Sequence, residues 1–203
     1  MPASRKLDLY KAHGAEYVAP KHPVLVATRP ARYLTVTGAG DPNGPAFAEK
    51  VRALYAMAYS IKMGKKRLGH DFKVAGLEGQ WWAAGGSAAL PATRRSAWQW
   101  RLMIRMPDFV KERCLVMAAR MLLEKGKGKA VEEVKLERVA EGRCVQMLHV
   151  GPYANEAETI GQMLRFVEAN GLAFAGKHHE IYLSNPGRTK PEKLRTILRH
   201  PVK

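Results

Sequence analysis

Apolar and polar positions in the first half of the chain predict four short strands and one long helix. Between residues 47 and 61 the apolar side chains recur every three or four positions, which is the spacing of an amphipathic helix, and Pro45 suits its first turn. Arg29-Pro30 would interrupt a strand ladder and therefore marks a turn. The expected strands cover residues 24–27, 33–36, 72–82 and 98–106, with a loop at 83–97.

The second half of the chain repeats this order of elements. A turn at Glu141-Gly142 separates two expected strands, and Gly151-Pro152-Tyr153 leads into a second amphipathic helix that carries Ile160 and Met163. A further helical stripe at residues 110–121 connects the two halves. The expected strands of this half cover residues 134–139, 144–150, 177–184 and 194–200.

A motif of the form Arg-x-apolar-apolar-Arg-x-Pro closes both halves, at residues 101–107 and again at 195–201. An internal duplication explains this recurrence, because each half is a β-hairpin, a helix and two more strands. The predicted fold is therefore α+β, with pseudo-symmetric tandem β-α-β-β repeats, mainly antiparallel strands and a ligand cleft between the repeats. We expect one domain over residues 1–203, with repeat one at about 22–107, a connecting helix at about 108–125, repeat two at about 131–203, and a loosely held start.

Composition narrows the class of protein. An apolar content of 46% over 203 residues is enough for a full core, and no apolar run approaches the length of a membrane span or resembles a signal peptide. We therefore expect a cytoplasmic protein that does not bind membranes. Cys114 and Cys144 stand far apart in apolar surroundings, which favours core thiols over a disulfide or a zinc site. The sequence leaves the oligomeric state open.

Strand alternation sorts the polar side chains of the second repeat into two faces. His178, Glu180 and Tyr182 share one face, while Ile181 and Leu183 share the other. The Ile/Leu face suits helix packing, so we expect the His/Glu/Tyr face to point at the cleft. The adjacent His178 and His179 point in opposite directions and cannot chelate one ion, so no metal is expected.

The first repeat offers a second glutamate, Glu78, which shares a strand face with Gln80 and Trp82. A carboxylate shielded by aromatic side chains gains proton affinity and can act as a general base or bind a cationic ligand. The alternative is an ion-paired carboxylate, since Arg101 and Arg195 are expected on neighbouring strands. Residue types alone leave both interpretations open.

Several segments taken together resemble the stand-alone GyrI-like small-molecule-binding proteins, over nearly the whole chain from about Leu7 onward. Asn185 and His200 depart from the family pattern, in which Asp and Gln are expected at these positions. The segments that carry the resemblance are Gly-Ala-Gly-Asp-Pro-Asn at 38–43, the helix segment 54–62, Leu-Glu-Gly-Gln-Trp-Trp at 77–82, His-Val-Gly-Pro-Tyr at 149–153, and above all 176–186 with 197–202.

The resemblance implies a multidrug-binding pocket in which a glutamate, here matching Glu180, meets bulky, flat and often cationic compounds. Stand-alone members are similar to cyclopropanoid hydrolases, which protect cells by opening the cyclopropane of DNA-alkylating natural products. Such chemistry, without a cofactor, would use Glu180 as the base that activates water and Tyr182 as the donor to the developing phenol. The ligand-binding residues expected beside this catalytic pair are Glu78, Trp81, Trp82, Tyr55, Tyr153 and His178.

Two other functions stay open at this point. The protein could sequester drugs without turning them over, because binding and catalysis would use much the same pocket. As the family name suggests, it could also be an inhibitory partner of a DNA topoisomerase.

The net charge of +16 raises the question of nucleic-acid binding. The basic residues are spread along the chain without a helix-turn-helix, zinc-finger or RNA-binding sheet motif, so nothing beyond weak, non-specific binding is expected. We expect any association with DNA to weaken steeply as salt rises, because counterion release would drive it. Fluorescence anisotropy with two unrelated duplexes at increasing NaCl concentration measures this, and tight, salt-resistant binding to one of them would contradict it.

Overall fold

The protein, seen in a computed structural model that describes residues 6–83 and 97–203, is built on one antiparallel sheet. Within these residues the strand order is β1-β6-β8-β7-β3-β4-β2-β5. This confirms the α+β class and the antiparallel strands, whereas the loop expected at 83–97 falls almost entirely outside the described residues. The strands are β1 (Val24–Ala27), β2 (Ala31–Ala39), β3 (Leu77–Ala83), β4 (Trp98–Met106), β5 (Lys135–Val139), β6 (Arg143–Val150), β7 (His178–Tyr182) and β8 (Arg195–Pro201).

The strands that flank the two predicted turns do not pair with each other, so the expected hairpins are wrong. β1 pairs with β6, and β2 pairs with β5 as well as with β4, so each of these strands has a partner in the other half of the chain. The Thr28 N–H donates to the Gly142 carbonyl at 2.8 Å, which shows that the turn after β1 contacts the turn before β6. Both halves follow the order β-β-α-β-β, and their origin by duplication stays a prediction.

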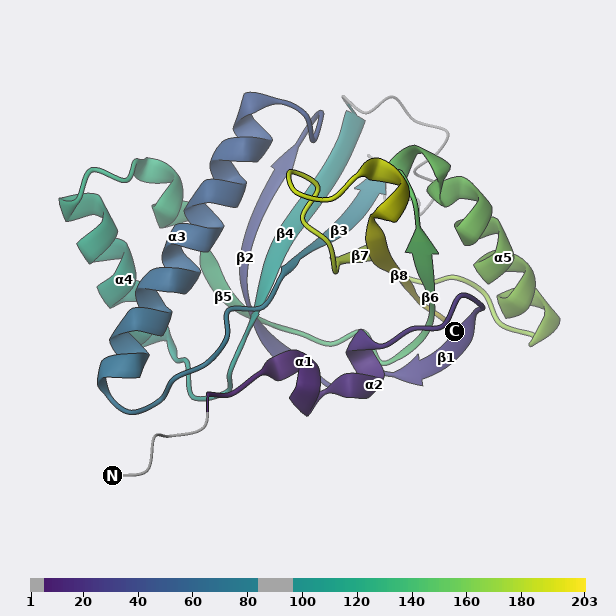
Figure 1. The fold of residues 1–203 in the computed structure, drawn as a ribbon, viewed down its shortest axis with the longest axis horizontal. Coiled ribbons are helices and arrows are strands. Elements are labelled where there is room, and N and C mark those ends of the chain that lie inside the picture. The colour runs from purple at the N-terminus through teal and green to yellow at the C-terminus, as the bar shows by residue number, and fades with distance from the viewer. Residues whose placement is uncertain (1–5, 84–96) are drawn as a thin grey trace.

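Helices α3 and α5 lie at opposite ends of the sheet, with the central strands β3 and β7 between them (Figure 1). α3 packs on β2 and β4, and α5 packs on β6. Pro45 does occupy the first turn of α3, after Gly44 as N-cap. In the described parts of the chain, none of the helices combines the length and apolar character that a membrane span requires. The helices are α1 (Leu9–Ala12), α2 (Gly14–Tyr17), α3 (Pro45–Arg67), α4 (Glu112–Glu124) and α5 (Glu156–Ala169), with 3-10 turns η3 (Lys129–Glu133), η4 (Tyr153–Asn155) and η5 (Pro191–Lys193).

The register of the sheet decides which face each side chain joins. Directly opposed residues point to the same face, and Leu102, Gly79, Glu180 and Leu198 form one continuous row across four strands. Leu102 belongs to the core under α3, and Leu198 to the core under α5. Glu180 therefore lies on the face that carries the helices, and the expectation that helices would cover the Ile181 face instead is wrong.

The N-terminal segment covers the other face of the sheet and is not the loosely held start expected from its polar sequence. Leu9, Glu16 and Tyr17 are all buried. Gln146 on β6 donates from its side chain to the Ala15 and Val18 carbonyls at 3.2 Å. These hydrogen bonds attach the segment to polar side chains of the sheet. The hydropathy of the segment therefore did not predict that it packs against the sheet.

Glu78 lies at the centre of this covered face, where it accepts hydrogen bonds from Tyr17 (2.9 Å) and His179 (3.0 Å). The second ring nitrogen of His179 lies 2.9 Å from Glu141. Burial alone would disfavour charge on His179, but the two carboxylates outweigh burial and raise the pKa of His179 to about 9. Despite its burial, Glu141 has its pKa lowered to about 2, mainly by His179.

Buried arginines complete a network of balanced charge. Arg105 lies 2.7 Å from Glu16, and Arg199 lies 3.5 Å from Glu141. With His179 protonated, these two arginines and the histidine face three carboxylates, from Glu16, Glu78 and Glu141. A buried ion pair becomes costly when one partner is removed, and the loss of His179 would leave two carboxylates, those of Glu78 and Glu141, without this partner.

Replacing His179 by Leu should lower the free energy of unfolding by about 3 kcal/mol, the usual loss when one partner of a buried ion pair is removed. Since the folded-state pKa of His179 is about 9 against an ordinary value of 6.5, its stabilisation is complete below pH 6.5 and is lost as the pH rises through 9. Urea denaturation from pH 6 to 9.5 should show this decline in the wild type and not in His179→Leu. The control is His22→Leu, a substitution at an exposed histidine, which should behave like the wild type. An equal decline of stability with pH in the wild type and in His179→Leu would contradict the account.

Candidate functional site

The polar side chains of β7 meet those of β3 in the middle of the helix-bearing face. Gly79 lies opposite Glu180, and Trp81 lies opposite His178. Because Gly79 has no side chain, the side chains of Trp81 and Tyr182 can close in over this position, between the two hydrophobic cores. The site therefore lies between the cores, where neither α3 nor α5 covers the sheet.

Glu180 is held by a neighbour on its own strand face. The Tyr182 hydroxyl donates to Glu180 Oε2 at 2.7 Å, and His178 Nε2 lies 3.4 Å from Glu180 Oε1. The second contact is close enough for charge attraction, but its geometry is not that of a hydrogen bond, and His178 Nε2 has no hydrogen-bond partner in residues 6–83 and 97–203. Tyr182 thus fixes the carboxylate of Glu180 and leaves His178 available to a ligand.

A second carboxyl group reaches the site from the first residue of α5. Glu156 is only 8% exposed, and its Oε1 atom has no hydrogen-bond partner in the described part of the chain. One side-chain atom from each of Glu156, His178 and Glu180 lies within 4.8 Å of the other two. Burial, and then the charge of Glu180, raises the pKa of Glu156 well above its usual range.

Trp81 brings an indole N–H to the same place. A Cβ atom at Gly79 would lie 2.9 Å from Trp81 Nε1 and 3.2 Å from the Tyr182 hydroxyl, so these two groups converge over the glycine. The Trp81 ring is itself fixed, stacked on Phe47 with ring centroids 5.9 Å apart. Its N–H is buried without an acceptor in the described residues.

The three buried side-chain atoms that lack a hydrogen-bond partner in residues 6–83 and 97–203 are Trp81 Nε1, Glu156 Oε1 and His178 Nε2. All three belong to this one site. An unpaired buried polar group costs stability, and its presence in a folded protein calls for an explanation. A ligand with both hydrogen-bond donors and acceptors would satisfy these atoms.

Tyrosines border the site. The Tyr153 ring meets the Tyr182 ring edge to face, with centroids 5.8 Å apart, and Tyr153 is 38% exposed. Burial and the nearby carboxylates of Glu180 and Glu156 raise the pKa of Tyr153 to about 12. Burial and Glu180 also raise the pKa of Tyr182 well above its usual value. Both phenols therefore stay protonated and uncharged at neutral pH.

The structure assembles most of the residues that the sequence predicts. Glu180, Tyr182, His178, Trp81 and Tyr153 lie together as described above. Tyr55, on α3, has its hydroxyl beside the backbone of Leu77 at the start of β3, on the α3 side of the site.

Glu78 and Trp82 do not join this group. Glu78 is opposite Ile181 rather than Glu180, and even-numbered residues of β3 point to the face under the N-terminal segment. Trp82 lies on that face too, where its N–H donates to Gln99 at 2.6 Å and Lys177 sits over its ring. The expectation that Glu78 shares a cleft with Glu180 is therefore wrong.

Glu156 is the site residue that the sequence analysis missed. It lies in phase with Ile160, Met163 and Val167, and so on the buried stripe of α5. A carboxylate on an otherwise apolar helix stripe is the signal that could have revealed it, because such a group is rarely buried without a role.

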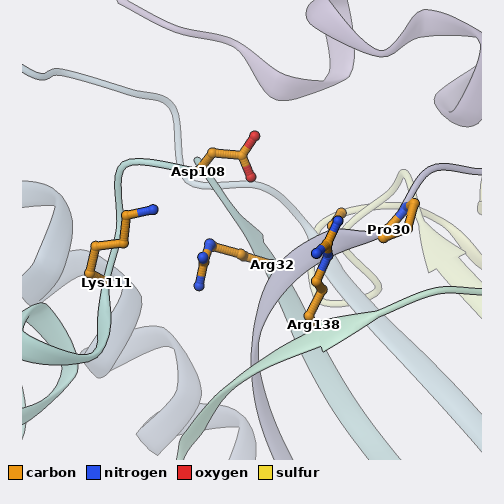
Figure 2. Close-up of a pocket in the computed structure, with 6 residues that line it drawn as sticks. Pro30, Arg32, Asp108, Lys111 and Arg138 are labelled. Carbon is orange, nitrogen blue, oxygen red and sulfur yellow. The ribbon is translucent and has the colours of Figure 1, made fainter.

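The pocket drawn in Figure 2 has a volume of about 250 Å³ and is distinct from this site. It opens at β2 and β5, which β3 and β4 separate from β7. The residues that line the pocket of Figure 2 are Pro30, Ala31, Arg32, Asp108, Lys111 and Arg138.

Carboxyl and imidazole groups such as those of Glu156, His178 and Glu180 can hold a cation or share a proton. We assign no metal to these three residues.

Comparisons with known proteins agree with the fold. Residues 25–203 match the family described as GyrI-like small molecule binding domain. A search of curated proteins finds no match. Among solved structures, an uncharacterized conserved protein from Listeria innocua is 42% identical, with a TM-score of 0.91 over 98% of this chain and 100% of that chain.

Two further structures extend the comparison. A protein from Listeria innocua described as a hydrolase is 40% identical, with a TM-score of 0.87 over 98% of this chain and 100% of its own. The C-terminal domain of EcmrR is 10% identical, with a TM-score of 0.60 over 90% of this chain and 97% of that chain, and shares the fold alone.

Replacing Gly79 by Ala should disturb the site directly, because the added methyl group would press on Trp81 and Tyr182. Overpacking of this kind costs about 1–3 kcal/mol. Thermal unfolding followed by near-ultraviolet circular dichroism should show a lower melting temperature and an altered tryptophan signal. The control is Gly64→Ala on α3, where a Cβ meets nothing within 4 Å and stability should be equal or higher. An unchanged Gly79→Ala spectrum would contradict the described convergence.

Proposed function

The chain belongs to the GyrI-like small-molecule-binding domain family, and from this premise we propose that its Glu180 site binds bulky, flat aromatic molecules and hydrolyses cyclopropane-bearing ones. The observation that carries the proposal is the convergence of the three unpaired buried atoms on one site. Trp81 and Tyr153 supply aromatic surface against which a planar ligand can pack. The carboxyl groups of Glu180 and Glu156 suit a ligand with donors or a positive charge.

Hydrolysis is favoured over sequestration by two observations. Glu180 is a carboxylate only 12% exposed at its side chain, and a hydroxyl fixes its orientation. A general base needs such a fixed position within reach of a water molecule. In addition, the similar protein from Listeria innocua is described as a hydrolase.

Glu180 would act on water. It takes a proton from the water molecule that attacks the ring methylene, while the carbonyl of the substrate becomes a phenol. Tyr182 directs its own proton to Glu180 Oε2 at 2.7 Å, so in this arrangement it positions the base. Direct donation by Tyr182 to the substrate would first require that hydrogen bond to break.

Replacing Glu180 by Gln should lower the turnover number on the order of 100-fold or more, because the amide keeps the shape of the carboxylate but cannot accept a proton. The substrate is a synthetic spiro-cyclopropyl dienone, and the absorbance of the phenol product reports the rate. Affinity, measured with single-turnover kinetics, should change little. The matched control is Glu158→Gln, an exposed residue on α5.

The same assay separates hydrolysis from sequestration. More than one product molecule per protein molecule shows turnover, whereas stoichiometric binding without product would establish a sequestering protein. A Glu180→Gln variant with the wild-type turnover number would remove Glu180 from the role of base.

A further inference from the structure

We infer that Glu156 is a further catalytic residue: it is the acid that protonates the carbonyl oxygen of the substrate. This inference rests on the proposed function, because it supplies the proton donor that the ring opening requires. It arises from the position of Glu156 beside Glu180, which brings carboxyl groups from helix α5 and strand β7 into one site.

Geometry places Glu156 for direct contact with a ligand. Its side chain joins those of His178 and Glu180 within 4.8 Å, and its Oε1 atom is buried without a partner in the described residues. Thr159, one turn further along α5, holds His149 of β6 at 2.9 Å and so ties the start of the helix to the sheet. The backbone at Glu156 is therefore anchored, and its side chain presents to the site an oxygen without a partner in the described residues.

One proton should be shared by the two carboxyl groups. Like charges in a buried site cannot both ionise cheaply, so one carboxyl keeps its proton. The Tyr182 hydroxyl donates to Glu180, which favours charge there. Burial and Glu180 raise the pKa of Glu156 well above its usual range, so of the two carboxyl groups Glu156 is the one that keeps the proton. The other titratable groups near Glu156 are His178 in the same cluster, and Tyr153 and Tyr182.

Tyr182 is the weaker candidate for the acid. Its proton is already engaged by Glu180, and burial together with that carboxylate raises its pKa well above the ordinary value. A protonated carboxyl group gives up its proton far more readily than such a phenol, even when its own pKa is raised. Glu156 thus takes the donor role that the sequence alone suggested for Tyr182.

The ring opening balances with water as the only co-reactant. The oxygen of water forms a bond to the ring methylene and passes a proton to Glu180. The strained carbon–carbon bond breaks, and its electron pair moves through the dienone to the carbonyl oxygen. That oxygen takes the proton of Glu156, which yields the phenol. Glu180 then holds one proton and Glu156 none, so transfer of this proton between the two neighbours restores the starting state.

The first experiment compares the pH dependence of turnover in the wild type and in Glu156→Gln, with a chelator present. The wild type should lose activity at high pH as Glu156 loses its proton, because a raised pKa keeps the acid protonated only below that value. Glu156→Gln should lower the turnover number on the order of 100-fold with little change in KM, and should lose the alkaline limb of the profile. Glu158→Gln is again the matched control.

A second measurement tests the shared proton without activity. Carbon-13 NMR resolves the labelled glutamate carboxyl groups, and the signal of Glu156 is assigned by its absence in Glu156→Gln. This signal should titrate well above the usual pKa range of a glutamate. The amide variant should also be at least as stable as the wild type at neutral pH, because a buried carboxyl with a raised pKa costs stability when the pH exceeds its unfolded value.

The outcomes separate this inference from the function on which it rests. If the wild type shows no turnover, the proposed hydrolysis and the acid role both fail. If Glu180→Gln is inactive while Glu156→Gln keeps the wild-type turnover number and both limbs of the profile, only the acid role fails. A Glu156 signal that titrates near pH 4.5 would also overturn it, with or without turnover.

Discussion

The pairing of β3 with β7 is the constraint on which both faces of the sheet depend. In this register Gly79 lies opposite Glu180, and Glu78 lies opposite Ile181. Neighbouring residues of a strand point to opposite faces, so a shift of either strand by one residue would bring both glutamates to the same face of the sheet. The register therefore separates a carboxylate that faces a ligand from one that holds the fold together.

Buried carboxyl groups are paired completely on one face of the sheet and incompletely on the other. Under the N-terminal segment, Glu78 and its partners are matched by His179 and two arginines, and each carboxylate has a hydrogen-bond donor. On the helix side, Glu156 has an oxygen with no partner in the described residues. Complete pairing rigidifies a core, whereas incomplete pairing is tolerated where a ligand or a shared proton completes it. The paired face thus supports the strands that present the unpaired one.

Local periodicity predicts the elements of this fold well, because alternation and helical spacing are properties of consecutive residues. It does not predict which strands pair with each other. β1 pairs with β6 instead of β2, because the Arg-Pro turn leads the chain away from β1 and does not fold it back against that strand. For the same reason, alternation placed Glu180 correctly relative to Tyr182 but could not relate it to Glu78 on another strand. Glu156 escaped notice because only the folded chain brings α5 to β7.

The central claim is that ligands bind on the helix side of the β3–β7 pair. A crystal structure of the protein soaked with a flat aromatic cation such as ethidium tests it most directly. The account predicts a ligand that packs against Trp81 and Tyr153, contacts Glu180, and leaves the Glu78–His179 hydrogen bond intact. A ligand bound beside Glu78, or only in the basic pocket of Figure 2, would contradict it.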